Sequence, residues 1–341
     1  MFLQQTSMQL TFSALKQTTP DDGFARLFRR AWPHYRRWWL QEGEEARPSY
    51  LASRRAIANY MPEMLPLWER LCELAGGGDS ESRFLSLYCP PAYQFGCSQA
   101  VWPGREPLLV RNYDYDPRAF DALLLHTNWL GRHAVLGMSD CLIGLLDGVN
   151  DAGLTASLTF GGQRLVGVGF GIPIVLRYVL ETCSTAAEAG RTLARIPSHM
   201  AYNVTALDAQ GDRVTVMIAP GGKAVVTNAP VATNHQQSVA WHSHARATAS
   251  VERERFLLRR LTLHPEPADR FVAEFLRPPL YSTAFEHGFG TLYTAAYWPG
   301  RAALSLEWPA ERWELSVARF AEGRRTVEYR PGGVQAHPVP G

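Results

Sequence analysis

The chain has 341 residues, an apolar content of 46% and a formal charge of +2. This length allows one large domain or a domain with an appendage, and the apolar content suffices for a core. The small charge excludes nucleic acid and an anionic membrane as default partners. No apolar run approaches the roughly 18 residues of a membrane span, and residues 1–22 lack the pattern of a secretory signal, so we expect a cytoplasmic protein.

The leading part of the chain has a helical pattern. Apolar residues recur at helical spacing from Phe24 onward, and an aromatic face continues beyond Pro33, where we expect a break. Ser49 can cap a second helix, and a third ends before the glycines at 76–78. We therefore predict that residues 1–96 form a helical leader.

From residue 97 the pattern changes to strands. Turns at Pro103-Gly104 and 220–222 bound strand-like segments, and residues 204–207, 213–219 and 223–227 predict a meander. Residues 172–182 and 186–196 predict two helices. Because runs of strands alternate with paired helices, we expect an α+β fold with two sheets packed face to face and helices outside.

Cysteine and histidine spacing argues against a metal centre. The five cysteines lie at positions 72, 89, 97, 141 and 183, without a CxxC pair, which favours reduced thiols over a disulfide framework or structural zinc. His242 and His244 lack a third ligand at a suitable spacing, so a flexible polar loop is expected there.

The hairpin that starts at Gly96-Cys97 carries the clearest chemical signal. Its second strand ends in Arg111 and Asp114, so a thiol, a guanidinium and a carboxylate converge. A thiol attacks an amide well only as a thiolate, which needs a base or a positive neighbour. The chain's own α-amino group, with a pKa of about 7.7–8.0, becomes such a base if the bond after Gly96 is cut. Glycine suits this cut because it lacks a Cβ and lets the thiol reach the preceding carbonyl.

Simpler interpretations of these residues remain open. A free cysteine is commonly a buried packing residue, and Arg111 with Asp114 can be an ion pair at a strand end. The protein would then be an unprocessed binding or scaffolding module. A third alternative is an uncut cysteine hydrolase that uses His235 or His126 as its base.

Several motifs in order resemble a known family. They are Gly96-Cys97-Ser98, Arg111-Asn112-Tyr113-Asp114-Tyr115, Asp147-Gly148-Val149-Asn150-Asp151-Ala152-Gly153-Leu154, Thr159-Phe160-Gly161-Gly162 and Thr233-Asn234-His235. The sequence thereby resembles the autoproteolytic acyltransferases and hydrolases related to penicillin acyltransferase and, more distantly, choloylglycine hydrolases and penicillin V acylases. These are N-terminal-nucleophile hydrolases, so the resemblance implies a four-layer αββα sandwich.

The resemblance also implies roles for individual residues. Cys97 matches the nucleophile that self-cleavage makes N-terminal, Asp114 the carboxylate that orients the freed amine, and Arg111 the arginine near the sulfur. Asn234 matches the oxyanion donor, with Asn228 as a competing choice, and Arg253 matches a later arginine, with Arg255 competing. The substrate pocket is expected to include Tyr113, Thr159 and Phe160.

The implied activity is the hydrolysis or transfer of the acyl group of a small linear amide or acyl thioester. Residues 97–341 would be the catalytic chain, and the leader would stay associated with it after the cut. No cofactor or metal is expected, and hydrolysis and acyl transfer remain alternatives.

Overall fold

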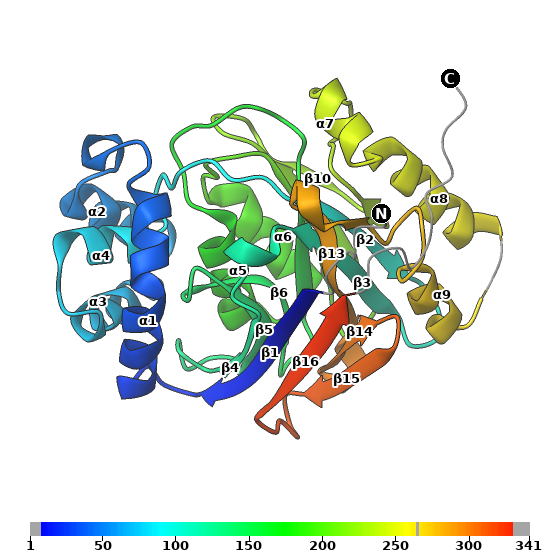
Figure 1. The fold of residues 1–341 in the computed structure, drawn as a ribbon, viewed down its shortest axis with the longest axis horizontal. Helices are drawn as coiled ribbons and strands as arrows, with labels where there is room; N and C mark the ends of the chain where they lie inside the picture. The colour runs from blue at the N-terminus through cyan, green and yellow to red at the C-terminus, as the bar shows by residue number, and fades with distance from the viewer. Residues whose placement is uncertain (1–7, 264–265, 330–341) are drawn as a thin grey trace, which may run out of the picture.

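A computed structural model describes residues 8–263 and 266–329 of the chain. Within these ranges two β-sheets pack face to face, helices cover both outer faces, and a group of leader helices stands at one end (Figure 1). The predicted α+β fold with its αββα layering is confirmed. No helix among the described residues is long and apolar enough to cross a membrane.

Residues 8–95 of the leader form one strand and four α-helices. They are β1 (Met8–Gln17), α1 (Asp22–Trp39), α2 (Tyr50–Tyr60), α3 (Met64–Leu74) and α4 (Asp79–Leu85). The side chain of Ser49 caps α2, as predicted. The predicted break at Pro33 is wrong, since α1 runs through it. Aromatic residues on both sides of Pro33, Phe28 and Tyr35, pack against Phe84 and keep the helix continuous.

Strand β1 is the part of the leader that the helical prediction omitted. It lies in the larger sheet, parallel to β4 (Leu123–Thr127) and antiparallel to β16 (Gly323–Tyr329). Its apolar residues alternate, with Phe12 and Ala14 buried, as a half-buried strand requires. The leader is therefore hydrogen-bonded on both sides into the sheet of the following chain.

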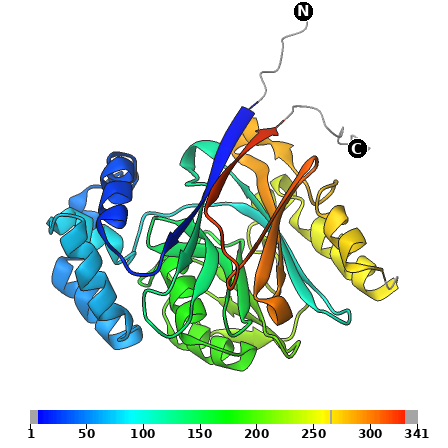
Figure 2. The same ribbon diagram turned by 90° about the horizontal axis from the view of Figure 1, so that it is seen from below.

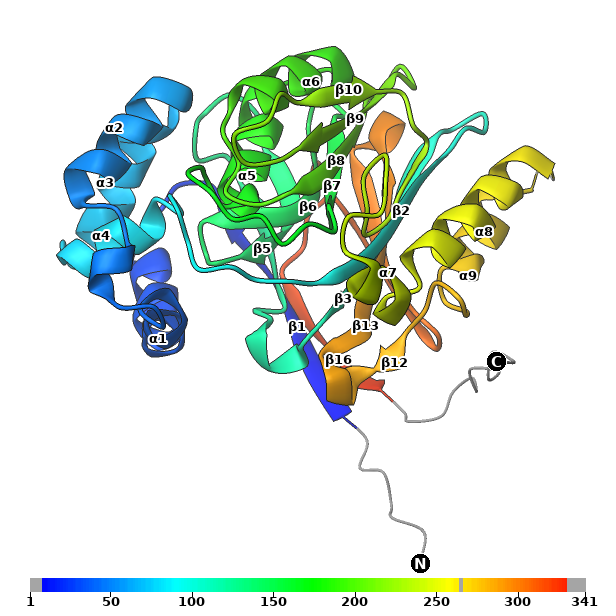
Figure 3. The ribbon, with the colours of Figure 1, turned by 90° about the horizontal axis from the view of Figure 1, so that it is seen from above.

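The larger sheet has nine strands in the order β10-β9-β8-β7-β6-β5-β4-β1-β16. The strands not yet given are β5 (Val135–Asp140), β6 (Gly144–Asn150), β7 (Thr155–Phe160), β8 (Tyr202–Leu207), β9 (Arg213–Ile218) and β10 (Val225–Thr227). The meander formed by β8, β9 and β10 confirms that prediction. Helices α5 (Ile172–Thr182) and α6 (Ala186–Arg195), also predicted, cover the outer face (Figure 3).

The second sheet has the order β11-β2-β3-β13-β14-β15, with β12 paired to β13. Its strands are β2 (Gly96–Trp102), β3 (Leu108–Tyr115), β11 (Val231–Ala232), β12 (Thr283–Ala284), β13 (Phe289–Trp298), β14 (Ala303–Trp308) and β15 (Glu311–Ser316). Leu257 of α8 (Ser250–Leu263) and Phe271 of α9 (Ala268–Glu274) pack on its outer face. Figure 2 shows these two helices on the side of the molecule opposite the leader helices.

The segment around His242 differs from the expected flexible loop. Residues His242–Ala247 form a short helix, α7, that precedes α8. The ring of His244 stacks on Trp241 at 5.0 Å between centroids and contacts Phe160 edge-on. Aromatic packing therefore orders a segment whose polar sequence suggested a loop.

Candidate active site

The register of the β2–β3 hairpin sorts the candidate residues onto two faces of the smaller sheet. Gly96 pairs with Asp114, and Cys97 pairs with Tyr113. Because side chains alternate along a strand, Cys97 and Arg111 face the space between the sheets, while Asp114 faces helix α8. The cleavage-site glycine thus lies beside the carboxylate, and the thiol lies beside the guanidinium.

Cys97 is fully buried and has polar neighbours on two sides. The Nη2 of Arg111 lies 3.3 Å from its Sγ, and its backbone N–H donates to Oδ1 of Asn234 at 3.0 Å. Burial raises the pKa of the Cys97 thiol to about 11, although Arg111 opposes this shift. In the uncut chain the thiol is therefore neutral at physiological pH.

Arg111 is held by a polar cluster that the sequence reasoning did not identify. Its Nη1 pairs with the carboxylate of Asp147 and donates to the carbonyl of Leu146 at 2.9 Å. Asp147 in turn accepts hydrogen bonds from the hydroxyls of Tyr293, at 2.6 Å, and Tyr297. Asp147 opens a motif that the resemblance used, but β13, which carries both tyrosines, was not among the predicted strands. These acceptors fix the guanidinium beside the sulfur.

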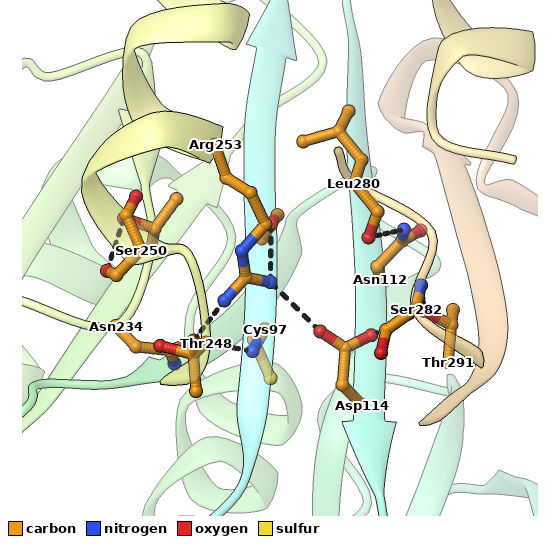
Figure 4. Close-up of polar contacts among 12 residues, drawn as sticks. Cys97, Asn112, Asp114, Asn234, Thr248, Ser250, Arg253, Leu280, Ser282 and Thr291 are labelled. Carbon is orange, nitrogen blue, oxygen red and sulfur yellow. Dashed lines mark hydrogen bonds and ion pairs between the residues drawn. The ribbon is translucent and has the colours of Figure 1, made fainter. Parts of the chain in front are cut away.

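Arg253 connects the remaining candidates, as Figure 4 shows. From α8 its Nη1 donates to Oδ2 of Asp114 and to Oγ of Ser98, both at 2.9 Å, and its Nη2 donates to Oδ1 of Asn234 at 2.7 Å. Thr291 donates to the other carboxylate oxygen of Asp114 at 2.6 Å. Burial raises the pKa of Asp114, and Arg253 opposes that shift. One buried guanidinium thus joins β2, β3 and the segment that follows β11 next to Cys97.

The two competing choices lie elsewhere. Asn228 is exposed just after β10, and Arg255 is exposed on α8. Of the two asparagines and two arginines compared, Asn234 and Arg253 belong to the cluster around Cys97. The rings of the two alternative bases bond other groups: that of His235 bonds Ser250 and Glu254, and that of His126 bonds the carbonyl of Val317. The structure therefore groups Cys97, Arg111, Asp114, Asn234 and Arg253 and leaves the competitors outside.

Asn234 is positioned by its neighbours in the larger sheet. The carbonyl of Thr233 accepts from the hydroxyl of Thr159 at 2.8 Å and from Nδ2 of Asn203 at 3.0 Å. The Nδ2 of Asn234 makes one long contact among the described residues, 3.4 Å to the carbonyl of Phe160. Its Oδ1 already accepts hydrogen bonds from Cys97 and Arg253, whereas its amide N–H groups make only this weak contact. This amide can therefore donate to a negative oxygen that forms next to Cys97.

Gly162 allows the backbone of Asn234 to approach closely. It has φ +68, and a Cβ placed on it would lie 2.3 Å from the Asn234 carbonyl oxygen. Both observations require glycine, because other residues rarely adopt this φ and the space is occupied. The Gly161-Gly162 motif thus positions Asn234.

We predict that Gly162→Ala costs about 3 kcal/mol or more in the free energy of unfolding and displaces Asn234. Gly221→Ala is the matched control, since Gly221 has φ +65 but no atom lies within 4 Å of the place that a Cβ would take. The control should lose only about 1 kcal/mol. Denaturant unfolding of both variants measures the difference, and equal losses would contradict the proposed contact.

A cavity of about 1060 Å³ adjoins the cluster on the α8 side. Gly96, Asp114 and Arg253 lie on its wall with residues of the segment 277–289. Tyr113, Thr159 and Phe160, the predicted pocket residues, do not line it and are buried between the sheets. In the uncut chain this cavity reaches the cleavage site from the side opposite those three residues.

Comparisons with known proteins agree with the resemblance noted in the sequence. Residues 102–313 match the family described as acyl-coenzyme A:6-aminopenicillanic acid acyl-transferase. The match includes Arg111, Asp114, Asn234 and Arg253 and begins after Cys97. No curated protein matches the sequence.

Three solved structures are similar over most of their length. Penicillin V acylase from Agrobacterium tumefaciens is 17% identical, with a TM-score of 0.44 over 67% of this chain and 90% of that chain. A conjugated bile acid hydrolase mutant from Clostridium perfringens is 13% identical, with a TM-score of 0.45 over 69% of this chain and 97% of that chain. The Caenorhabditis elegans ortholog of N-acylethanolamine-hydrolyzing acid amidase is 16% identical, with a TM-score of 0.43 over 60% of this chain and 93% of that chain.

Proposed function

The chain belongs to the acyl-coenzyme A:6-aminopenicillanic acid acyl-transferase family, and from this premise we propose that it is an N-terminal-nucleophile cysteine enzyme that cuts its own chain between Gly96 and Cys97. The processed protein then hydrolyses a small amide or acyl thioester, or transfers its acyl group. The observation that carries this proposal is the contact set of Cys97: its sulfur beside Arg111, and its backbone nitrogen beside Asn234.

Self-cleavage in this scheme converts one amide bond into a thioester and then into two chain ends. The Sγ of Cys97 attacks the carbonyl carbon of Gly96, the bond from that carbon to the nitrogen of Cys97 breaks, and the thiol proton ends on this nitrogen. Water then attacks the thioester, releasing the Gly96 carboxylate and regenerating the thiol. The freed nitrogen starts beside Oδ1 of Asn234, 3.0 Å away, and can accept a proton.

The reaction with substrate uses the same atoms. The α-amine of Cys97 takes the thiol proton, the sulfur attacks the substrate carbonyl, and the amide N–H groups of Asn234 stabilise the negative oxygen. The leaving amine or thiol departs with the proton, and an acyl thioester remains on Cys97. Water completes hydrolysis, or an acceptor amine completes transfer. Arg111 favours the thiolate, and Arg253 fixes both Asp114 and Asn234.

Both products of the cut are proposed to stay together. Strand β1 lies between β4 and β16, so removing the leader would break hydrogen bonds on both of its edges. An unpaired β4 would then expose backbone groups that need partners. The functional protein would accordingly consist of residues 1–96 bound to residues 97–341.

Intact mass under denaturing conditions tests the proposal. The purified protein should separate into a leader of 96 residues and a remainder of 245, which is 341 minus 96. Incubation with a panel of N-acyl amines and acyl thioesters should then add one acyl mass to the peptide that begins at Cys97. An uncut chain that still turns over substrate would favour a histidine base instead.

The rate of self-cleavage is expected to rise with pH. Because burial raises the pKa of the Cys97 thiol to about 11, the thiolate fraction grows about tenfold per pH unit below that value. Precursor made by cell-free synthesis can be shifted to buffers between about pH 7 and pH 10, and the new N-terminus followed with time. A rate that falls as pH rises would contradict attack by the thiolate.

A further inference from the structure

Phe95, two residues before Cys97, is fully buried in a group of aromatic rings. The distances from its ring centroid are 5.7 Å to Tyr113, 6.3 Å to Tyr115, 6.4 Å to Phe160, 6.1 Å to Tyr202 and 5.8 Å to Tyr93. All five neighbours are uncharged aromatic side chains, and together they enclose the ring of Phe95.

Four of the five neighbouring rings belong to the catalytic chain. Tyr113 and Tyr115 come from β3 of the smaller sheet, and Phe160 and Tyr202 come from the paired strands β7 and β8 of the larger one. Phe95 therefore lies between the sheets, in the same layer as the sulfur of Cys97. Burial raises the pKa of Tyr113, Tyr115 and Tyr202, which keeps their phenols neutral at physiological pH.

The covalent chemistry relates Phe95 to the substrate. The leader is the first acyl group that the enzyme carries, because self-cleavage joins the carbonyl of Gly96 to the sulfur of Cys97. A substrate acyl group later forms a thioester with the same sulfur. Its chain can accordingly follow the path that Gly96 and Phe95 take in the uncut protein.

We propose that the space filled by Phe95 is the acyl pocket of the processed enzyme. This pocket takes an uncharged, unbranched acyl chain with an aromatic or apolar end, and the C-terminal tail of the leader competes with the substrate for it. This inference rests on the function proposed above. About five atoms separate the Gly96 carbonyl carbon from the Phe95 ring, so a 6-phenylhexanoyl group has the matching length. A Cβ on Gly96 would lie 3.0 Å from Cβ of Asp114, which disfavours a branch next to the carbonyl.

The tail can leave this pocket without dissociation of the leader. Backbone hydrogen bonds join Leu87 to Gly171 and Cys89 to Gly169 and anchor the chain up to that point. Pro90 and Pro91, which follow, have no N–H to donate. The ring of Tyr93 also packs on Trp38 and His199, so the tethered end that can swing out after the cut is residues 94–96, while β1 and the leader helices stay in place.

The first experiment compares substrates on processed wild-type protein. The 4-nitroanilides of 6-phenylhexanoic, acetic and adipic acids share one leaving group, and only adipic acid places a charge at the far end. We expect kcat/KM for the 6-phenylhexanoyl compound to exceed both others by about 10- to 100-fold, the range for burying one aromatic ring. Equal values, or a preference for the adipic compound, would overturn the pocket assignment.

The second experiment changes the tail. Phe95→Ala should lower KM for the 6-phenylhexanoyl compound several-fold, because a tail without the ring competes less, and kcat per processed molecule should not change. Gln94→Ala is the matched control, since Gln94 is exposed, and its KM should equal that of wild type. An unchanged KM in F95A would overturn the competition by the tail. The substrate comparison needs no variant, so it decides the pocket assignment even if F95A is not cut.

These outcomes separate the pocket from the proposed function. If the chain stays whole and no acyl donor modifies Cys97, the proposed function fails and the pocket proposal fails with it. If the chain is cut and Cys97 is acylated, but the three anilides react equally, only the pocket assignment fails.

Discussion

Cys97→Ala is expected to produce a single uncut chain of 341 residues that acquires no acyl group. The substitution removes the sulfur for both reactions, and loss of a catalytic nucleophile costs on the order of 10⁶-fold in kcat. The variant should still fold, because the replacement is small and the cluster formed by Arg253 with Asp114 and Asn234 does not depend on the sulfur. Intact mass and the acyl-trapping assay measure the two losses.

The matched control is Cys183→Ala. Cys183 is also a buried free thiol, but it follows α5 and contacts the hydroxyls of Thr182 and Thr192. This variant should be cut and acylated like wild type. If C97A is cut normally, the assignment of the nucleophile is wrong. If wild type stays whole and inert while C97A behaves identically, the protein fits the binding or scaffolding alternative.

Asn234→Ala is expected to lower kcat of the processed enzyme by about 10²- to 10³-fold, the usual effect of losing one oxyanion donor. The same change leaves the backbone N–H of Cys97 and Nη2 of Arg253 without their buried acceptor, at a stability cost of about 1–3 kcal/mol. Single-turnover kinetics on the processed variant separate acylation from substrate binding, and denaturant unfolding measures the second effect.

Asn228→Ala serves as the control because it removes the competing Thr-Asn side chain. Asn228 is exposed, and its backbone carbonyl accepts a hydrogen bond from Nε of Arg213 at 3.2 Å. Alanine keeps that carbonyl, so activity and stability should stay near wild type. A large loss in N228A together with a normal N234A would reverse the assignment of the oxyanion donor.

Much of the fold follows from local sequence patterns. The meander of β8, β9 and β10 and helices α5 and α6 were predictable because alternation and helical spacing involve residues close in the chain. The leader shows the limit of this reasoning. Strand β1 alternates as a strand should, yet its partners β4 and β16 lie more than a hundred residues away, so the helices that follow it dominated the prediction.

The candidate site divides in the same way. Gly96-Cys97 and the Arg111/Asp114 pair were visible in one hairpin, where the turn determines which residues face each other. Asn234 was preferred to Asn228 from the family resemblance and not from any local pattern, because its contact with Cys97 spans 137 positions. Nor could sequence show that Asp147 and two tyrosines of β13 hold Arg111. Hairpin register depends on near neighbours, whereas these contacts form only when two sheets and helix α8 pack around one buried sulfur.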